Sequence, residues 1–142
     1  AESAVDELRA VCPDVAGTWT AGVALPGGDF AVDGIAALIE KLCRAYPFLT
    51  GAWARRLVRA YGTDAFAVLG EAKGIRDLGV DFGATLTEAE VRWLVSKEYV
   101  QQAEDILWRR SKLGLRMSVA DTERLRIWLQ KFRAQGTKKA EI

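Results

Sequence analysis

The stretch TLTEAEVRWLVSKEYVQQAEDILWRRSKLG, residues 85–114, decides the fold. Its first half predicts a helix that begins at Glu88. Thr87 and Glu90 have the spacing of a capping box, in which a hydroxyl and a carboxylate each accept a hydrogen bond from a free backbone amide. Apolar residues then recur at helical spacing and form one stripe, which contains Val91, Leu94 and Val95.

The second half of the stretch predicts another short helix, which begins at about Ala103. Acidic residues occupy its first turn and basic residues its last turn, the arrangement that a helix dipole favours. Gly114 is expected to end this helix in a left-handed conformation. The apolar positions are Ala103, Ile106, Leu107 and Leu113.

Two charged residues fall inside these apolar stripes on a helical wheel, Glu98 in the first and Arg110 in the second. Because a lone buried charge is costly, we expect a Glu98–Arg110 ion pair between the two helices, whose loss would cost roughly 3–5 kcal/mol. Asp81 is a second candidate partner for Arg110, and exposure of both side chains at helix ends remains an alternative. Arg109 is expected to form an ordinary surface pair with Asp105.

Composition limits the chemistry that the chain can perform. The 142 residues are half hydrophobic and 27% charged, typical of one soluble globular domain. No apolar run has membrane-spanning length and the first residues do not resemble a signal peptide, which predicts a cytoplasmic protein. There is no histidine, and Cys12 and Cys43 stand alone, so we expect reduced, buried cysteines, no metal site and no histidine-based catalysis.

The net charge of +1 is unevenly distributed, with an acidic beginning and a basic end. A basic end can bind nucleic acid, an anionic membrane or an acidic partner domain, and it can equally be a solvated helix face. The pI of about 8.0 is below the values typical of nucleic-acid-binding modules, so we expect no nucleic-acid partner.

In chain order, residues 1–12 predict a helix that starts without a cap, which suggests a piece of a longer chain. A Gly/Pro-rich linker follows, with Trp19 and Leu25 as expected anchors. Asp33 is expected to cap a helix through Arg44. Further helices are predicted at residues 51–61, from about residue 64 to 69 or 72, and from Ser118 to about residue 135. The outer face of the first carries Arg55, Arg56 and Arg59. An ordered loop without a phosphate-binding pattern is expected at about 73–87, and its apolar residues, Ile75, Leu78, Val80 and Phe82, are expected to cover the helical core.

The expected fold class is therefore all-α: a compact bundle of about five or six short helices, preceded by a helix and an extended Gly/Pro linker. Residues 1–30 would be the end of a preceding region plus the linker, 31–136 the helical domain and 137–142 a disordered tail. The last helix has a narrow stripe flanked by basic residues, which favours packing on its own domain over lying on an anionic membrane. That stripe contains Leu125, Trp128, Leu129 and Phe132.

Several segments resemble the C-terminal helical domain of the bacterial FAD-dependent sn-glycerol-3-phosphate dehydrogenases. They are LPGG (25–28), YPFL (46–49), RLVRAYG (56–62), VLGEA (68–72) and the run from DLGVDFG to RRSKLGL (77–115). The similarity extends from about Ala1 to about Leu129. Its most specific part is EYVQQAEDILWRRSKLGL, residues 98–115.

The resemblance implies a parent enzyme that oxidises glycerol 3-phosphate to dihydroxyacetone phosphate and passes electrons through FAD to quinone, peripherally on the cytoplasmic face of the inner membrane. The GxGxxG segment that would hold FAD is absent from this sequence. No catalytic or flavin residue can therefore be assigned to a position here. The chain alone is expected to bind no FAD and to be inactive.

The resemblance implies a role in docking on and stabilising the missing N-terminal FAD/substrate domain. Candidate interface residues are Arg109, Lys112, Arg116 and Trp128, where the first three could instead steer an anionic substrate and Trp128 could contact the membrane. A homo-oligomeric parent is left open. The alternative to the enzyme domain is a stand-alone helical protein-interaction module.

Overall fold

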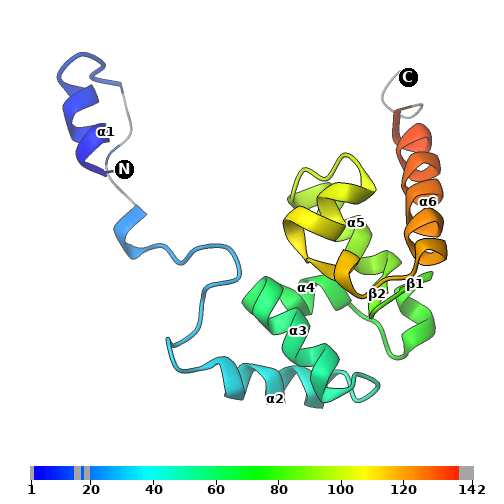
Figure 1. The fold of residues 1–142 in the computed structure, drawn as a ribbon. Coiled ribbons are helices and arrows are strands. Elements are labelled where there is room, and N and C mark those ends of the chain that lie inside the picture. The colour runs from blue at the N-terminus through cyan, green and yellow to red at the C-terminus, as the bar shows by residue number, and fades with distance from the viewer. Residues whose placement is uncertain (1, 15–16, 18–19, 138–142) are drawn as a thin grey trace.

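The computed structural model describes residues 2–14, 17 and 20–137. Within them the chain forms six α-helices and one small antiparallel sheet of two strands (Figure 1). This confirms the expected mostly helical fold, whereas the sheet was not predicted. The elements are α1 (Glu2–Arg9), α2 (Ile35–Ala45), α3 (Gly51–Tyr61), α4 (Ala65–Leu69), β1 (Asp81–Gly83), β2 (Leu86–Thr87), α5 (Glu88–Lys97) and α6 (Val119–Thr137).

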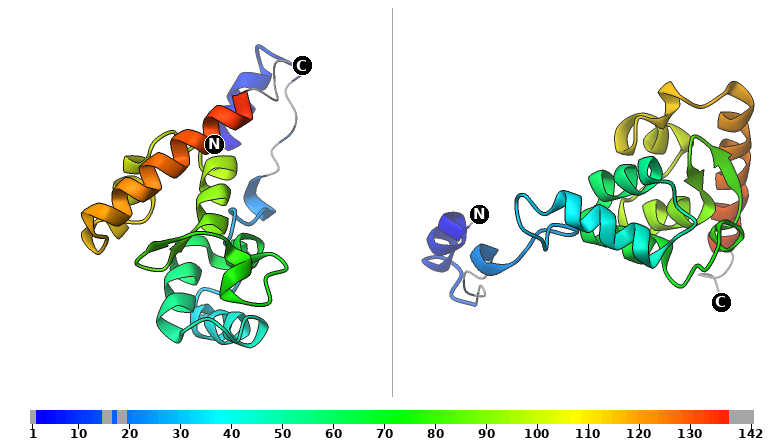
Figure 2. Two further views of the ribbon diagram at one scale, coloured as in Figure 1. Left: turned by 90° about the vertical axis from the view of Figure 1, so that its right-hand side faces the viewer. Right: turned by 90° about the horizontal axis from the view of Figure 1, so that it is seen from below.

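Helix α1 lies away from the other helices (Figure 2). No residue of α1 is buried, Cys12 is exposed and Leu25 is 80% exposed, so the expectations of a buried Cys12 and an anchoring Leu25 were wrong. The predicted anchor Trp19 lies outside the described residues. The linker meets the domain at Gly27, whose carbonyl accepts a hydrogen bond from the Thr63 amide at 2.9 Å.

The domain has two hydrophobic cores side by side. The first lies among α2, α3 and α4 and includes Leu42, Leu57 and Leu69. The second joins the small sheet, α5, the following segment and α6. Its fully buried side chains include Phe82, Leu94, Ile106 and Leu125. Tyr61 at the end of α3 packs against both cores and therefore lies at their junction.

Helix α3 has the predicted bounds because both of its ends carry local signals. The Thr50 hydroxyl accepts a hydrogen bond from the Trp53 amide, and Gly62 follows the helix with a φ of 55°. Asp33 does not cap α2: Gly34 is the N-cap residue, without a side-chain hydrogen bond. Ser118 does cap α6, because its Oγ accepts a hydrogen bond from the Asp121 amide at 3.1 Å.

The expected loop at 73–87 contains a 3₁₀ turn (Ile75–Leu78) and the β1–β2 pair. Asp81 is paired with Thr87 and Gly83 with Leu86, with an irregular register between them. Phe82 and Leu86 are completely buried. The hairpin thus places two large apolar side chains in the second core; the burial of Phe82 was expected, whereas that of Leu86 was not.

The helix predicted from Ala103 is a short segment that is π-helical over Asp105–Arg110. The Ser111 amide and hydroxyl both donate to the carbonyl of Ile106, at 3.0 Å and 2.6 Å, which gives the wider i to i−5 bonding. The left-handed residue is Lys112, with a φ of 58°, and not Gly114. Gly114 is needed for a different reason, since a Cβ there would lie 2.6–2.9 Å from the Trp108 ring.

Helix α6 packs on its own domain as expected, with Leu125 and Leu129 at 0% and 2% exposure. It continues to Thr137, two residues beyond the predicted end. Apart from Thr137, the tail predicted at residues 137–142 lies outside the described residues. None of the described helices combines the length and apolar character that a membrane crossing requires.

Candidate interaction site

A buried polar cluster joins the two cores at the junction of α3 and α5. Arg56 Nη1 and Nη2 each lie 2.7 Å from an oxygen of Glu90, a bidentate pair. The Tyr61 hydroxyl donates to Glu90 Oε1, also at 2.7 Å. The side chains of Glu90 and Arg56 are 1% and 18% exposed, so the cluster is shielded from water.

Arg56 also holds the turn between β1 and β2. Its Nε donates to Thr85 Oγ1 and its Nη2 to the Thr85 carbonyl, both at 2.8 Å. Ala84 and Thr85 have φ angles of 49° and 68°, the conformation of a two-residue hairpin turn that normally favours asparagine or glycine. Because a β-branched residue is strained there, the hydrogen bonds from Arg56 help to stabilise the turn.

The capping box predicted for Thr87 and Glu90 was wrong. The Thr87 side chain makes no cap hydrogen bond. The Glu88 amide donates instead to the Val80 carbonyl at 2.8 Å, since the preceding chain runs alongside the start of the helix. The sequence did not lead to two members of this cluster, Arg56, which was predicted to face outward, and Glu90. The burial of Glu90 could have been predicted, because Glu90 lies one turn before Leu94 on the apolar face of the helix.

Burial and the carboxylate of Glu90 both raise the pKa of the Tyr61 hydroxyl far above its ordinary value. Tyr61 therefore stays protonated and acts as a hydrogen-bond donor to Glu90 at neutral pH. With all three side chains engaged in one another, the cluster is a structural link between the two cores. It offers no free acid or base for catalysis.

Arg110 Nη1 lies 3.3 Å from Glu98 Oε2, and Arg110 Nη2 donates to the Glu98 carbonyl at 2.8 Å. The two side chains are 43% and 42% exposed, so the expected burial of this pair between apolar faces was wrong. Glu98 is the C-cap of α5, where the chain leaves the helix and takes the carboxylate off the apolar stripe. Asp81 does not contact Arg110 and accepts instead from the Gly83 amide.

The mutation Arg110→Met is accordingly expected to change the free energy of unfolding by no more than about 1 kcal/mol, because water screens an exposed pair. Urea unfolding followed by circular dichroism measures this difference. A loss of about 3 kcal/mol or more would mean that the pair is buried in solution after all.

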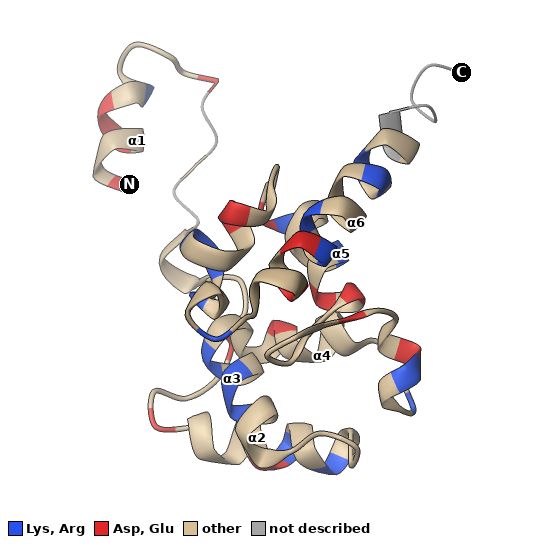
Figure 3. Ribbon diagram, turned by 45° about the vertical axis from the view of Figure 1, so that its right-hand side comes forward, with Lys and Arg blue, Asp and Glu red and all other residues tan. Residues whose placement is uncertain are grey.

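An open groove lies between α3 and the segment that follows the π-helical turn, and it has a volume of about 420 Å³. We call it the arginine groove. Its lining residues are Ala52, Arg55, Arg56, Arg59, Ala60, Arg110, Ser111 and Arg116. Figure 3 shows how basic residues gather along α3.

The charge of the arginine groove is poorly compensated by the chain itself. Arg56 and Arg110 are paired with Glu90 and Glu98. Among the described residues, the side chains of Arg55, Arg59 and Arg116 have no hydrogen bond, ion pair or ring contact. No acidic residue lines the groove. It therefore presents three exposed guanidinium groups that can accept an anionic partner.

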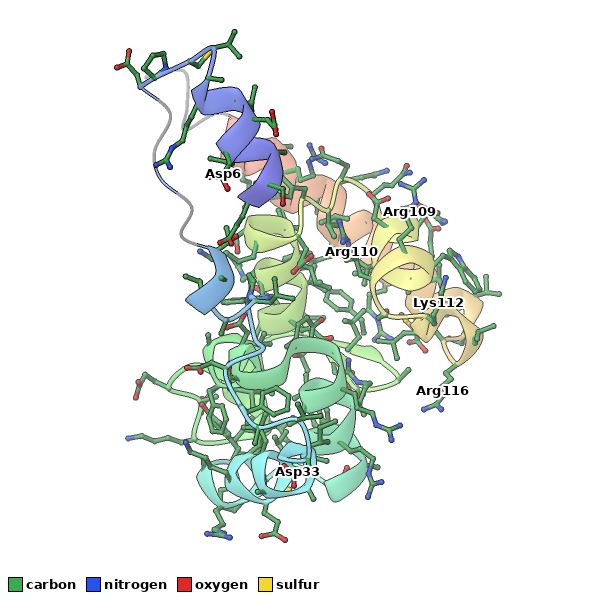
Figure 4. All side chains as sticks on the ribbon, turned by 90° about the vertical axis from the view of Figure 1, so that its left-hand side faces the viewer. Asp6, Asp33, Arg109, Arg110, Lys112 and Arg116 are labelled. Atoms are coloured by element: carbon green, nitrogen blue, oxygen red, sulfur yellow. The ribbon has the colours of Figure 1, made fainter. Side chains whose placement is uncertain are left out.

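Figure 4 shows three of the predicted interface residues, Arg109, Lys112 and Arg116, along one edge of the domain together with Arg110, and Arg116 lies nearest α3. Only Arg116 of the predicted interface set lines the arginine groove. Arg109 forms the expected pair with Asp105 at 2.8 Å, and the Lys112 ammonium group donates to the Trp108 carbonyl.

Trp128 lies elsewhere, on α6, within a row of aromatic rings. Its ring meets the edge of Phe82 at a centroid distance of 5.6 Å and stacks on Phe132 at 4.9 Å, and Arg92 lies over it at 5.5 Å. The structure does not bring Trp128 together with the basic interface residues. Its partly exposed side borders an apolar depression formed with Val80 and Ile127.

The described residues do not fit FAD. Dinucleotide binding needs a strand, a glycine-rich turn and a helix whose free amides face the phosphates. In the glycine-rich segment here, carboxylates lie where phosphates would have to bind. Glu88 accepts a hydrogen bond from the Val80 amide. A Cβ on Gly79 would lie 2.8 Å from Glu88, and a Cβ on Gly83 would lie 2.8 Å from Asp121. Within the described part of the chain, no three acidic or cysteine side chains gather into a metal site.

Comparison with known proteins gives consistent results over most of the chain. It is 38% identical over 136 residues to the aerobic glycerol-3-phosphate dehydrogenase of Escherichia coli, covering 95% of this chain and 27% of the relative. The glycerol-3-phosphate dehydrogenase of Pseudomonas aeruginosa is 42% identical over 130 residues, which are 92% of this chain and 25% of the relative.

A third relative, the D-erythritol 1-phosphate dehydrogenase of Brucella abortus, is 35% identical over 121 residues, 85% of this chain and 24% of its own length. The chain thus spans about a quarter of the curated relatives it matches. Residues 18–130 match the family described as the C-terminal domain of alpha-glycerophosphate oxidase. The chain belongs to this family of C-terminal domains.

Proposed function

We propose that the chain is the C-terminal domain of an FAD-dependent glycerol-3-phosphate dehydrogenase. The observation that carries the proposal is the match over residues 18–130, combined with two relatives of that activity that continue for about three more chain lengths. The parent enzyme would oxidise glycerol 3-phosphate to dihydroxyacetone phosphate. FAD would belong to its N-terminal region, because the described residues here do not fit it.

Within that enzyme the domain docks on and stabilises the N-terminal FAD/substrate domain. Residues 1–30 form the end of that preceding region and the linker, and residues 31–136 form the docked domain. The basic edge with Arg109, Lys112 and Arg116 is the candidate interface. The exposed α1 supports this division, since none of its residues is buried against the helical domain.

Electron transfer to quinone would place the parent at the cytoplasmic face of the inner membrane, as a peripheral protein. Trp128 is the candidate for membrane contact among the described residues. Its ring already contacts the rings of Phe82 and Phe132, which leaves less of it free to enter a membrane. Membrane contact through α6 is therefore less well supported than contact of the basic edge with the catalytic domain.

The proposal is tested by comparing the parent enzyme with a version that ends before Asp33. Flavin content, reduction of a dye acceptor by glycerol 3-phosphate and pelleting with membranes are measured for both. We expect the shortened enzyme to lose stability and flavin together, since it lacks the surface that covers its FAD domain. Unchanged flavin content and melting temperature would contradict a stabilising role, and a parent that does not oxidise glycerol 3-phosphate would contradict the assignment itself.

A further inference from the structure

We propose that the arginine groove is the docking site for a carboxylate-bearing surface of the N-terminal part of the parent chain. The inference rests on the proposed function, because it names the partner that the groove binds. It adds a place on the domain and a chemistry for the contact, neither of which follows from the family.

The distribution of arginine partners supports this choice. Most surface arginines of the described chain pair with a carboxylate on the same or a neighbouring element, as Arg44, Arg92, Arg109, Arg124 and Arg126 do. Four have no side-chain partner there: Arg55, Arg59, Arg76 and Arg116. Three of these four line one groove. Unpaired guanidinium groups gathered in one place attract a negatively charged partner.

The chemistry of the groove favours carboxylates over a single phosphate. Two further lining arginines, Arg56 and Arg110, already pair with carboxylates of this chain, which shows that arginines here can bind carboxylates. The free guanidinium groups come from two separate elements, α3 and the segment ending at Arg116. The groove that they line has a volume of about 420 Å³ and is open to solvent, so it can hold several side chains of a protein surface.

The path of the chain brings the partner to this side of the domain. The linker from the N-terminal region meets the domain at Gly27, directly against the end of α3. A Cβ on Gly27 would lie 2.1 Å from the Tyr61 carbonyl, and Gly62 would meet Gly27 at a similar distance, so this contact is close and fixed. Arg59 precedes Gly62 by only three residues. The N-terminal region therefore enters beside the helix that carries Arg55 and Arg59.

The experiment uses the intact parent enzyme with a protease site inserted after Val23, which is exposed. After cleavage, association of the two parts is followed by gel filtration at increasing salt. We expect the cleaved wild type to stay together and the double variant R55E/R59E to dissociate, with an affinity at least about 100-fold weaker. Its matched control is R76E, which reverses an equally unpaired arginine outside the groove and should dock as the wild type does.

The outcomes separate the two proposals. If the cleaved wild type falls apart even at low salt, the docking function fails. If the wild type holds together and R55E/R59E holds equally well, only the arginine groove inference is overturned. If R76E weakened the association of the two parts as much as R55E/R59E does, the inference would also be overturned, because the effect would then not depend on the groove.

A small-anion site is the remaining alternative for the groove. Inorganic phosphate is the probe, and its binding to the 142-residue chain is measured by calorimetry. Tight phosphate binding that R55E/R59E abolishes, with docking of the cleaved parent unchanged, would overturn the carboxylate proposal. Restored docking in R55K/R59K relative to R55E/R59E would support it, because lysine keeps the charge.

Discussion

Replacing Arg56 with Met is expected to lower the free energy of unfolding by about 3–5 kcal/mol. Glu90, at 1% exposure, would lose both guanidinium hydrogen bonds and keep only the Tyr61 hydroxyl. The turn at Thr85, which has a φ of 68°, would lose its two hydrogen bonds from Arg56 at the same time. Urea unfolding of the 142-residue chain, followed by circular dichroism, measures the difference.

The control is Arg55→Met, the neighbouring arginine of α3, which is exposed and has no partner among the residues that the structure describes. It should change the stability by less than about 0.5 kcal/mol. A second comparison is Arg56→Met combined with Glu90→Leu. Removing both charges should restore part of the lost stability, because no carboxylate is then left buried without its partner. Equal effects of Arg56→Met and Arg55→Met would mean that the cluster does not link the two cores.

The second large effect is expected from Leu125→Ala on α6, a loss of about 2–5 kcal/mol. Leu125 is completely buried in the second core, and truncation leaves a cavity that the neighbouring side chains only partly fill. Ile127→Ala is the matched control on the same helix. Since Ile127 is 44% exposed, its truncation should cost less than about 1 kcal/mol.

This comparison also decides what α6 does. If the apolar face of α6 were reserved for a membrane instead of packing in the second core, Leu125→Ala would hardly change the stability of the domain in water. Thermal unfolding that shows equal, small effects for both substitutions would contradict the packing of α6 on its own domain.

The sequence was sufficient for the elements whose signals are local. Thr50 and Gly62 mark the two ends of α3, and Ser118 marks the beginning of α6, since each of these residues acts on its own helix end. The stripe of α6 predicted its buried residues for the same reason. The Glu98–Arg110 pair could also be proposed from spacing, but its exposure depended on where α5 ends.

What the sequence did not predict depends on contacts between distant segments. Glu90 was interpreted as a capping residue because Arg56 lies 34 residues away and no local pattern connects the two. The hairpin at 81–87 has Ala84 and Thr85 where turn statistics expect other residues, and it is held from outside by Arg56. Likewise, the π-helical turn requires Ser111 to bond Ile106, which helical periodicity does not reveal.

The candidate site illustrates the same limit. Arg116 was selected from a basic run, but its neighbours in the structure are Arg55 and Arg59, about 60 residues earlier. Those two arginines had been assigned to an ordinary outer face of α3. Only the packing of α3 beside the segment after the π-helical turn turns two separate basic faces into one groove.

The most direct test of the docking account is arginine modification by phenylglyoxal, read residue by residue by mass spectrometry, on the 142-residue chain and on the intact parent enzyme. The account predicts that Arg55, Arg59 and Arg116 react readily in the chain alone and are protected in the parent, whereas Arg76 reacts equally in both. Equal reactivity of the three groove arginines in chain and parent would contradict it, because the arginine groove would then face solvent in the complete enzyme.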